Sequence, residues 1–171
     1  MRYDQLESQL NCLLNVLSEQ LDIYNQLLKT VRKEKNAVAV SAFDILNDVI
    51  TEKTYLVHKL NEIEKQRIFL MDAIAANYDI DVKHFTLSLL ADRVDQKTAE
   101  ELLQLRRDLS SVLRKLQFEN NINKDLITHC ISLMNNSINL LNSMNDQAVT
   151  YIQNGRFTKT KENGVLFTSK I

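Results

Sequence analysis

The three histidines, His58, His84 and His129, are candidate metal ligands in this chain. Helical bundles that bind two iron ions use two Glu-x-x-His motifs, because this spacing puts a carboxylate and an imidazole on one helix face. The residues three positions before His58, His84 and His129 are Tyr55, Asp81 and Leu126. His129 and its neighbour Cys130 lack a second pair of ligands nearby in the sequence. We therefore expect neither a metal site nor a cofactor.

The two glycines, Gly155 and Gly164, lie near the end of the chain, which contains no proline. A phosphate-binding loop needs glycines ahead of a helix, so the sequence offers no such loop before residue 155. Spacing indicates no Ser–His or Cys–His pair, although pairing in space stays open. Catalytic groups usually lie on loops, and few segments here favour loops. We therefore expect a binding protein or a structural rod rather than an enzyme.

The charge of the chain is nearly balanced, with a formal net charge of −1 and an isoelectric point near 6.3. This balance gives no general attraction to nucleic acid or to an anionic membrane surface. A local basic cluster, which we interpret as a solvated helix face, comprises Arg106, Arg107, Arg114 and Lys115. No run of about 18 apolar residues is present, so we expect no insertion into a membrane.

Cys12 and Cys130 lie far apart, each within a leucine-rich helical pattern. This spacing is not a disulfide framework, and we expect two buried free thiols. The first residues lack the basic and apolar regions of a signal peptide. Together these features predict a cytoplasmic protein.

Apolar residues recur at alternating steps of three and four, which is typical of amphipathic helices with a heptad pattern. The predicted helices cover about residues 3–35, 41–77, 82–93 and 96–150. A fifty-residue helix gains little from propensity alone, so it must pack on the others. We expect an all-α fold: an elongated antiparallel bundle or coiled coil of three long helices and one short helix. The bundle domain spans 1–150, and a flexible tail follows at 151–171.

Three short polar side chains are expected to cap the later helices. Ser41, with Asp44 three residues on, suits the start of the second helix. Asp81 is expected to cap the short helix. Thr98 and Glu101 form a capping box at the start of the last helix.

Two cations, Lys53 and Arg67, interrupt the apolar seam of the second helix. A long cation at such a position either extends to the surface or meets a carboxylate of a facing helix. We expect at least one of them to meet a carboxylate on the first or last helix, which would fix the register of the bundle. The candidate partners are Glu19, Asp22, Glu34 and Glu119.

The stretch ITEKTYLVHKLNEIEKQR at residues 50–67 resembles the FlgN family of flagellar export chaperones. The family helix carries Glu-Lys, a leucine-rich spacing and Leu-Glu-x-x-Arg. This chain has Glu52-Lys53, and Ile63 stands in place of the leucine before Glu64. Further along the chain, an Asn-x-Asn pair comes before Leu126, as in the family. The family tail often has the pattern Tyr-Gly-x-x-Gly, and here Tyr151 and Gly155 match while Ile152 replaces the first glycine.

The resemblance implies a cytoplasmic chaperone that binds hook–filament junction proteins of the FlgK and FlgL type. Such a chaperone keeps them unpolymerised and delivers them to the cytoplasmic domain of the export gate protein FlhA. The family's client site lies on the last helix and the tail after it, and the resemblance implicates Tyr151 in docking on the gate. A structural or scaffolding coiled coil without clients is the alternative function.

An apolar groove of helical period suits the amphipathic termini of junction proteins. The candidate client-binding residues are Leu133, Met134, Leu140, Leu141, Met144 and Val149. The alternative is that these residues pack on the bundle. We favour packing for Leu133 and Leu140, whereas Leu141, Met144 and Val149 suit both roles equally.

The tail has its own turn signals. Gly155 suits a left-handed cap that ends the last helix. Asn163-Gly164, between flanks rich in Phe, Thr and Val, favours a hairpin. A lone hairpin is marginal in water. We therefore expect a mobile tail that becomes ordered on a partner, with Tyr151 at its root; a frayed end without a role is the alternative.

Overall fold

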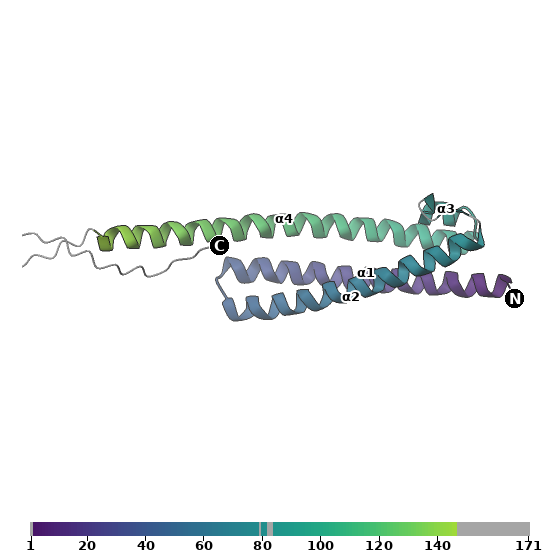
Figure 1. Cartoon of the computed structure of the whole chain (residues 1–171), viewed down its shortest axis with the longest axis horizontal. Helices are drawn as coiled ribbons and strands as arrows, with labels where there is room; N and C mark the ends of the chain where they lie inside the picture. Colours follow the sequence, from purple (N-terminus) through teal and green to yellow (C-terminus); the bar gives the residue numbers. More distant parts are fainter. Residues whose placement is uncertain (1, 79, 82–83, 147–171) are drawn as a thin grey trace, which may run out of the picture. The chain divides into compact units, whose positions relative to one another are not determined.

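The computed structural model describes residues 2–78, 80–81 and 84–146. Within these ranges the chain has four helices and no strand, which confirms the predicted all-α bundle. The helices are α1 (Arg2–Ala39), α2 (Phe43–Asn77), α3 (Leu87–Ala91) and α4 (Gln96–Asp146). Figure 1 shows α1 and α2 as a hairpin and α3 beside the end of α2. The predicted tail and its hairpin lie outside the described residues.

The connection between α1 and α2 is shorter than predicted, because α1 continues to Ala39. Ser41 has a positive φ of 55°. Its N–H donates to the Val38 carbonyl at 3.2 Å, and the Ala42 N–H donates to the Ala37 carbonyl at 3.0 Å. These two bonds are those of a Schellman motif, so Ser41 ends α1. The prediction that Ser41 caps α2 was wrong: Ala42 occupies that position without a side-chain bond.

The caps of α3 and α4 also differ from the predicted ones. The side chain of Thr86 caps α3 by accepting from the Leu89 N–H at 3.3 Å, so the assignment of this role to Asp81 was wrong. Asp95 caps α4, because its Oδ2 accepts from the Thr98 N–H at 3.1 Å. The backbone N–H of Thr98 is the main reason that the pKa of Asp95 is lowered. A carboxylate satisfies an orphan amide well, so Asp95 takes the position expected for Thr98.

The chain divides into two compact units, Met1–Lys124 and Asp125–Ile171. The first unit contains two apolar clusters. One cluster joins α1, α2 and α4 with α3 and comprises Leu10, Leu13, Leu17, Met71, Ile74, Ala75, Phe85, Leu90, Leu102 and Leu109. The other joins α1, α2 and α4 and comprises Ile23, Leu27, Leu28, Val31, Leu56, Leu60, Ile63, Val112 and Leu116. The heptad seams of the long helices thus supply the core of this unit.

The two cysteines are free thiols, as expected, but they are not buried in the way predicted. Cys12 is exposed and Cys130 is half-buried. Cys12 comes directly before Leu13, a fully buried seam residue. A residue one position away from the seam lies about 100° around the helix, which places it beside the core.

One polar layer contains Arg67, one of the two cations in the seam of α2. Its guanidinium donates to both oxygens of Glu64 on the same helix, at 2.6 and 2.8 Å. Glu64 also accepts from the buried Gln20 of α1 at 3.0 Å. The hydrogen bonds from Arg67, more than the opposing desolvation, lower the pKa of Glu64. Arg67 therefore meets a local carboxylate, which in turn ties α2 to α1.

A second polar layer contains Lys53 and joins all three long helices. Lys53 Nζ lies 2.7 Å from Oε2 of Glu34 on α1, and only 8% of the Glu34 side chain is exposed. The same oxygen accepts from Nδ2 of Asn123 on α4 at 3.0 Å. This pair confirms the prediction that a seam cation meets a carboxylate on the first or last helix.

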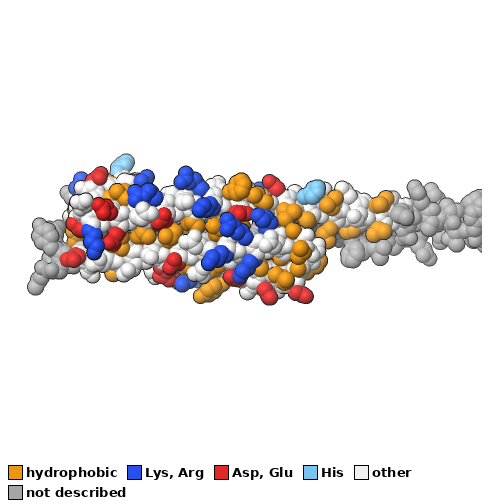
Figure 2. Space-filling view, turned by 180° about the vertical axis from the view of Figure 1, so that it is seen from behind, with side chains coloured by type: hydrophobic (Ala, Val, Ile, Leu, Met, Phe, Trp, Pro, Cys, Tyr) orange, Lys and Arg blue, Asp and Glu red, His pale blue; other side chains and the backbone are white. Residues whose placement is uncertain are grey.

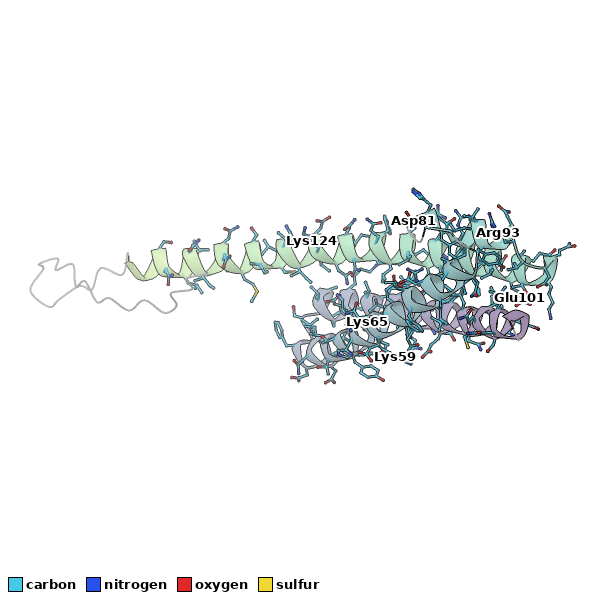
Figure 3. The ribbon with its side chains drawn as sticks, turned by 45° about the vertical axis from the view of Figure 1, so that its right-hand side comes forward. Lys59, Lys65, Asp81, Arg93, Glu101 and Lys124 are labelled. Carbon is cyan, nitrogen blue, oxygen red and sulfur yellow. The ribbon has the colours of Figure 1, made fainter. Side chains whose placement is uncertain are left out.

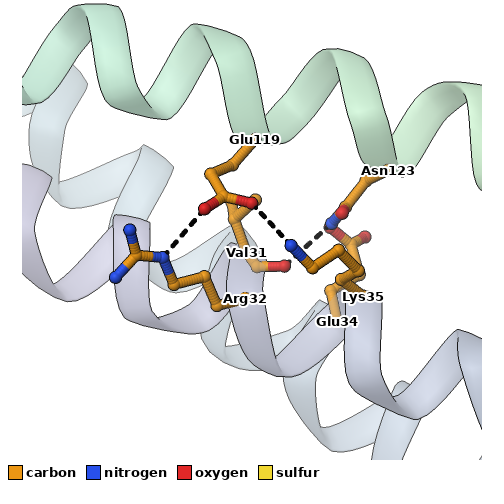
Figure 4. A network of polar contacts seen from close by, with 6 residues as sticks. All are labelled: Val31, Arg32, Glu34, Lys35, Glu119 and Asn123. Atoms are coloured by element: carbon orange, nitrogen blue, oxygen red, sulfur yellow. Dashed lines mark hydrogen bonds and ion pairs between the residues drawn. The ribbon is translucent and has the colours of Figure 1, made fainter.

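Beside this layer, Glu119 of α4 bridges two cations of α1 (Figure 4). It accepts from Arg32 at 3.0 Å and from Lys35 at 2.9 Å. These hydrogen bonds, first from Lys35 and then from Arg32, lower the pKa of the Glu119 carboxyl. Asn123 follows one turn later and donates to the Val31 carbonyl at 2.8 Å. The seam of α4 in the first unit therefore ends in polar contacts with α1.

Replacing Lys53 with methionine tests the second polar layer. We expect Lys53→Met to lower the free energy of unfolding by about 1–3 kcal/mol, because the buried Glu34 carboxylate loses its cation. Lys59→Met is the matched control, since Lys59 forms an exposed pair with Glu19 at 3.1 Å. The control should cost about 0–1 kcal/mol in urea unfolding. Equal losses in the two variants would contradict a special role for Lys53.

Candidate functional site: an uncharged apolar surface on the last helix

The second unit begins at Asp125, and within it α4 continues to Asp146. Residues 126–145 contain no Asp, Glu, Lys or Arg, although a quarter of the whole chain is charged. We call this part of α4 the uncharged segment. In Figure 2, blue and red side chains are scattered over most of the view, whereas the part beside the grey residues on the right is orange, white and pale blue. Lys124, labelled in Figure 3, is the last lysine before this segment.

The uncharged segment carries its apolar side chains on one half of the helix. At about 100° per residue, the apolar positions span an arc of about 180°. Several of these side chains are more than half exposed: Ile131 (53%), Leu133 (53%), Met134 (57%), Leu140 (62%) and Leu141 (63%). A helix that packs on a core usually covers an arc of this kind. On the uncharged segment, much of this arc is exposed, which is typical of a surface that binds another protein.

The structure brings four of the predicted client-binding residues together on this arc. Leu133, Met134, Leu140 and Leu141 are all exposed. The expectation that Leu133 and Leu140 pack on the bundle stays a prediction, which the alanine variants below test. Met144 belongs to α4, but its side chain is outside the described part of the structure, as are Val149 and Tyr151 entirely.

Sequence reasoning missed Ile131, which is as exposed as Leu133 and lies on the same arc. It also missed Leu126, Ile127 and Ile138, which are half-buried. The heptad seam used for prediction skips positions 127, 131 and 138, because they fall beside it. The absence of charge throughout 126–145 is the signal that would have indicated the whole surface.

The opposite half of the uncharged segment is polar without being ionic. It consists of Thr128, His129, Ser132, Asn135, Asn136, Asn139, Asn142 and Ser143. Within the described ranges, no three His, Cys, Asp or Glu side chains come close enough to hold a metal ion. No helix in those ranges is long and apolar enough to span a membrane. The chemistry that this surface offers is burial of apolar area against a partner.

The fold and this surface define a helical bundle with an exposed apolar helix face that suits protein binding. The family model described as FlgN protein matches residues 1–159. The chain belongs to the FlgN family and is a flagellar export chaperone. This match confirms the resemblance seen at residues 50–67. Comparisons with curated proteins and with solved structures give no match.

Alanine substitutions test whether the exposed leucines contribute to folding. We expect Leu133→Ala and Leu140→Ala to change the free energy of unfolding by less than about 0.5 kcal/mol, because neither side chain is buried. Leu109→Ala, in the same helix, should cost about 2–5 kcal/mol, because Leu109 is part of the core. Chemical denaturation of the three variants checks the difference. A loss at Leu133 or Leu140 similar to that at Leu109 would mean that these residues pack in the core.

Proposed function

We propose that this chaperone binds hook–filament junction proteins of the FlgK and FlgL type in the cytoplasm. It holds their terminal helices on the apolar arc of the uncharged segment and so prevents premature polymerisation. The contact includes Leu133, Met134, Leu140 and Leu141, and it extends to Met144 and Val149. The exposure of four neighbouring apolar side chains on one helix is the observation that carries this proposal.

The physics of the surface supports a helical client. An amphipathic helix laid along α4 buries its own apolar face against the arc, and each buried leucine side chain contributes about 1.5–3 kcal/mol. Methionine at position 134 adapts to partners of different shape. A chaperone with two related clients benefits from both properties.

A structural coiled coil without clients is the alternative function. Such a rod would need a permanent partner along the arc, and its surface would carry the flanking charges that fix coiled-coil pairing. Residues 126–145 have no such charges. Family membership also favours the chaperone.

We further propose that the chaperone delivers its clients to the cytoplasmic domain of FlhA through Tyr151. This tyrosine and Gly155 match the tail pattern of the family, and both fall within the matched residues 1–159. A tyrosine supplies a large apolar ring and a hydroxyl group, which suits a docking anchor.

Two aspartates on the apolar arc test client binding. We expect Leu133→Asp with Met134→Asp to raise the Kd for the terminal helices of a junction protein at least about tenfold, since carboxylates lose water on binding. The matched control is Asn136→Asp with Asn139→Asp, which adds the same charge on the polar half and should leave the Kd unchanged. Isothermal titration calorimetry measures the Kd of each double variant for the client helices, and circular dichroism checks that the helix content is unchanged. Equal affinities for the two double variants would contradict the proposed surface.

A separate pair of variants tests the tail. Tyr151→Ala and deletion of residues 152–171 should both weaken binding to the FlhA cytoplasmic domain. Pull-down with the purified FlhA domain, in the presence and absence of a client, measures how much of each variant binds to that domain. Full FlhA binding by both variants would show that the tail is only a chain end.

A further inference from the structure

A heptad repeat covers the uncharged segment and Asp146, the charged residue that follows it. Residues 126–132, 133–139 and 140–146 have the sequences LITHCIS, LMNNSIN and LLNSMND. Each block starts with leucine, continues with a second apolar residue, and then has two polar residues. The fifth position holds Cys130, Ser137 or Met144, and the sixth holds Ile131, Ile138 or Asn145. A shift of seven residues therefore places leucine on leucine, the second apolar residue on another apolar residue, and the two polar residues on polar ones.

The repeat lies on one helix surface. A straight α-helix drifts by only about 20° per heptad, so the leading leucines of the three blocks stay on one face. Leu133 and Leu140 are both exposed, as are Met134 and Leu141 in the second position. One block covers about 10 Å of the helix axis. In the first block, Leu126 and Ile127 are half-buried. The arc thus offers the same pair of leading apolar residues in each block, fully exposed in the second and third blocks and partly exposed in the first.

We infer that this surface binds a client helix in more than one register, with the registers related by one heptad. A client helix that covers two blocks occupies either the first and second blocks or the second and third. The inference rests on the proposed function, because it concerns how the client helix lies on that arc. A single chaperone surface then accepts client helices of different lengths and sequences.

The groups that normally fix a register are missing from this segment. Coiled coils fix pairing through charges beside the seam and through single buried polar residues. Residues 126–145 carry no charge, and Ser137 is the one polar residue at an inner position of the first two blocks. The first unit shows the contrast, because Glu34, Lys53 and Asn123 hold its three helices in one register.

The occupant is a client helix rather than a second copy of the chain. In the first unit, α4 pairs with α1 through the bridges of Glu119 to Arg32 and Lys35. The uncharged segment offers no charged groups to any partner, so family membership decides: an export chaperone needs a surface for its client. Apolar burial alone favours the partner with the better apolar face, and an amphipathic client provides one.

The experiment uses the full chain and a synthetic two-heptad peptide from a terminal helix of a junction protein. The single variants Ile127→Asp, Met134→Asp and Leu141→Asp each place one charge at the second position of a block. Ile127→Asp and Leu141→Asp should each weaken binding only about twofold, because one of two registers survives. Met134→Asp should weaken binding at least about tenfold, because both registers use the central block. The control Asn139→Asp adds a charge on the polar half of that block.

The combination of Ile127→Asp with Leu141→Asp gives the sharpest result. We expect it to weaken binding at least about tenfold, far more than the product of the single effects, because no intact pair of blocks remains. Additive effects, or a terminal variant as damaging as Met134→Asp, would overturn the register inference while the client site stands. Failure of the unaltered chain to bind the peptide would overturn both proposals. A dimer that the peptide does not dissociate, seen in sedimentation, would assign the surface to a second copy.

Discussion

The first unit depends on one carboxylate oxygen, Oε2 of Glu34, on which all three long helices meet. It accepts from Lys53 of α2 and from Asn123 of α4 while its own side chain is almost fully buried. A buried carboxylate is costly unless its partners are in place, so other pairings of these helices are disfavoured. Helices that pack only through apolar side chains shift along one another more easily than helices joined by such a contact. The Glu34 carboxylate therefore fixes the register of the bundle, whereas the buried leucines provide most of its stability.

Much of this fold could be predicted from the sequence, because heptad patterns carry most of the information about long helices. Leu13 and Leu17 of α1 and Leu102 of α4, which belong to the apolar pattern of these helices, are fully buried. The sequence could predict that Lys53 or Arg67 meets a carboxylate of another helix, because a cation at a seam either extends to the surface or finds such a group. Arg67 met Glu64 of its own helix instead, since a partner three residues away is available without any tertiary contact.

Two features could not be predicted, and each has a physical reason. Several residues near each helix end have side chains that could cap it, and the backbone geometry determines which one does. Asp95 and Thr86 cap the starts of α4 and α3, whereas Ser41 lies at the end of α1. The exposure of Leu133 and Leu140 was missed because their heptad pattern is the same as that of the buried Leu102 and Leu109. The absence of charge from residues 126–145 is what separates this part of α4 from the part that carries Leu102 and Leu109.

The uncharged arc has a consequence for the behaviour of the chaperone in a crowded solution. Colloidal stability depends on mutual repulsion between molecules, and a net charge of −1 provides very little. An open apolar surface on such a molecule promotes precipitation. In the proposed complex, a client covers the arc and adds its own polar face. The proposed function therefore implies that the client helps to keep its chaperone in solution.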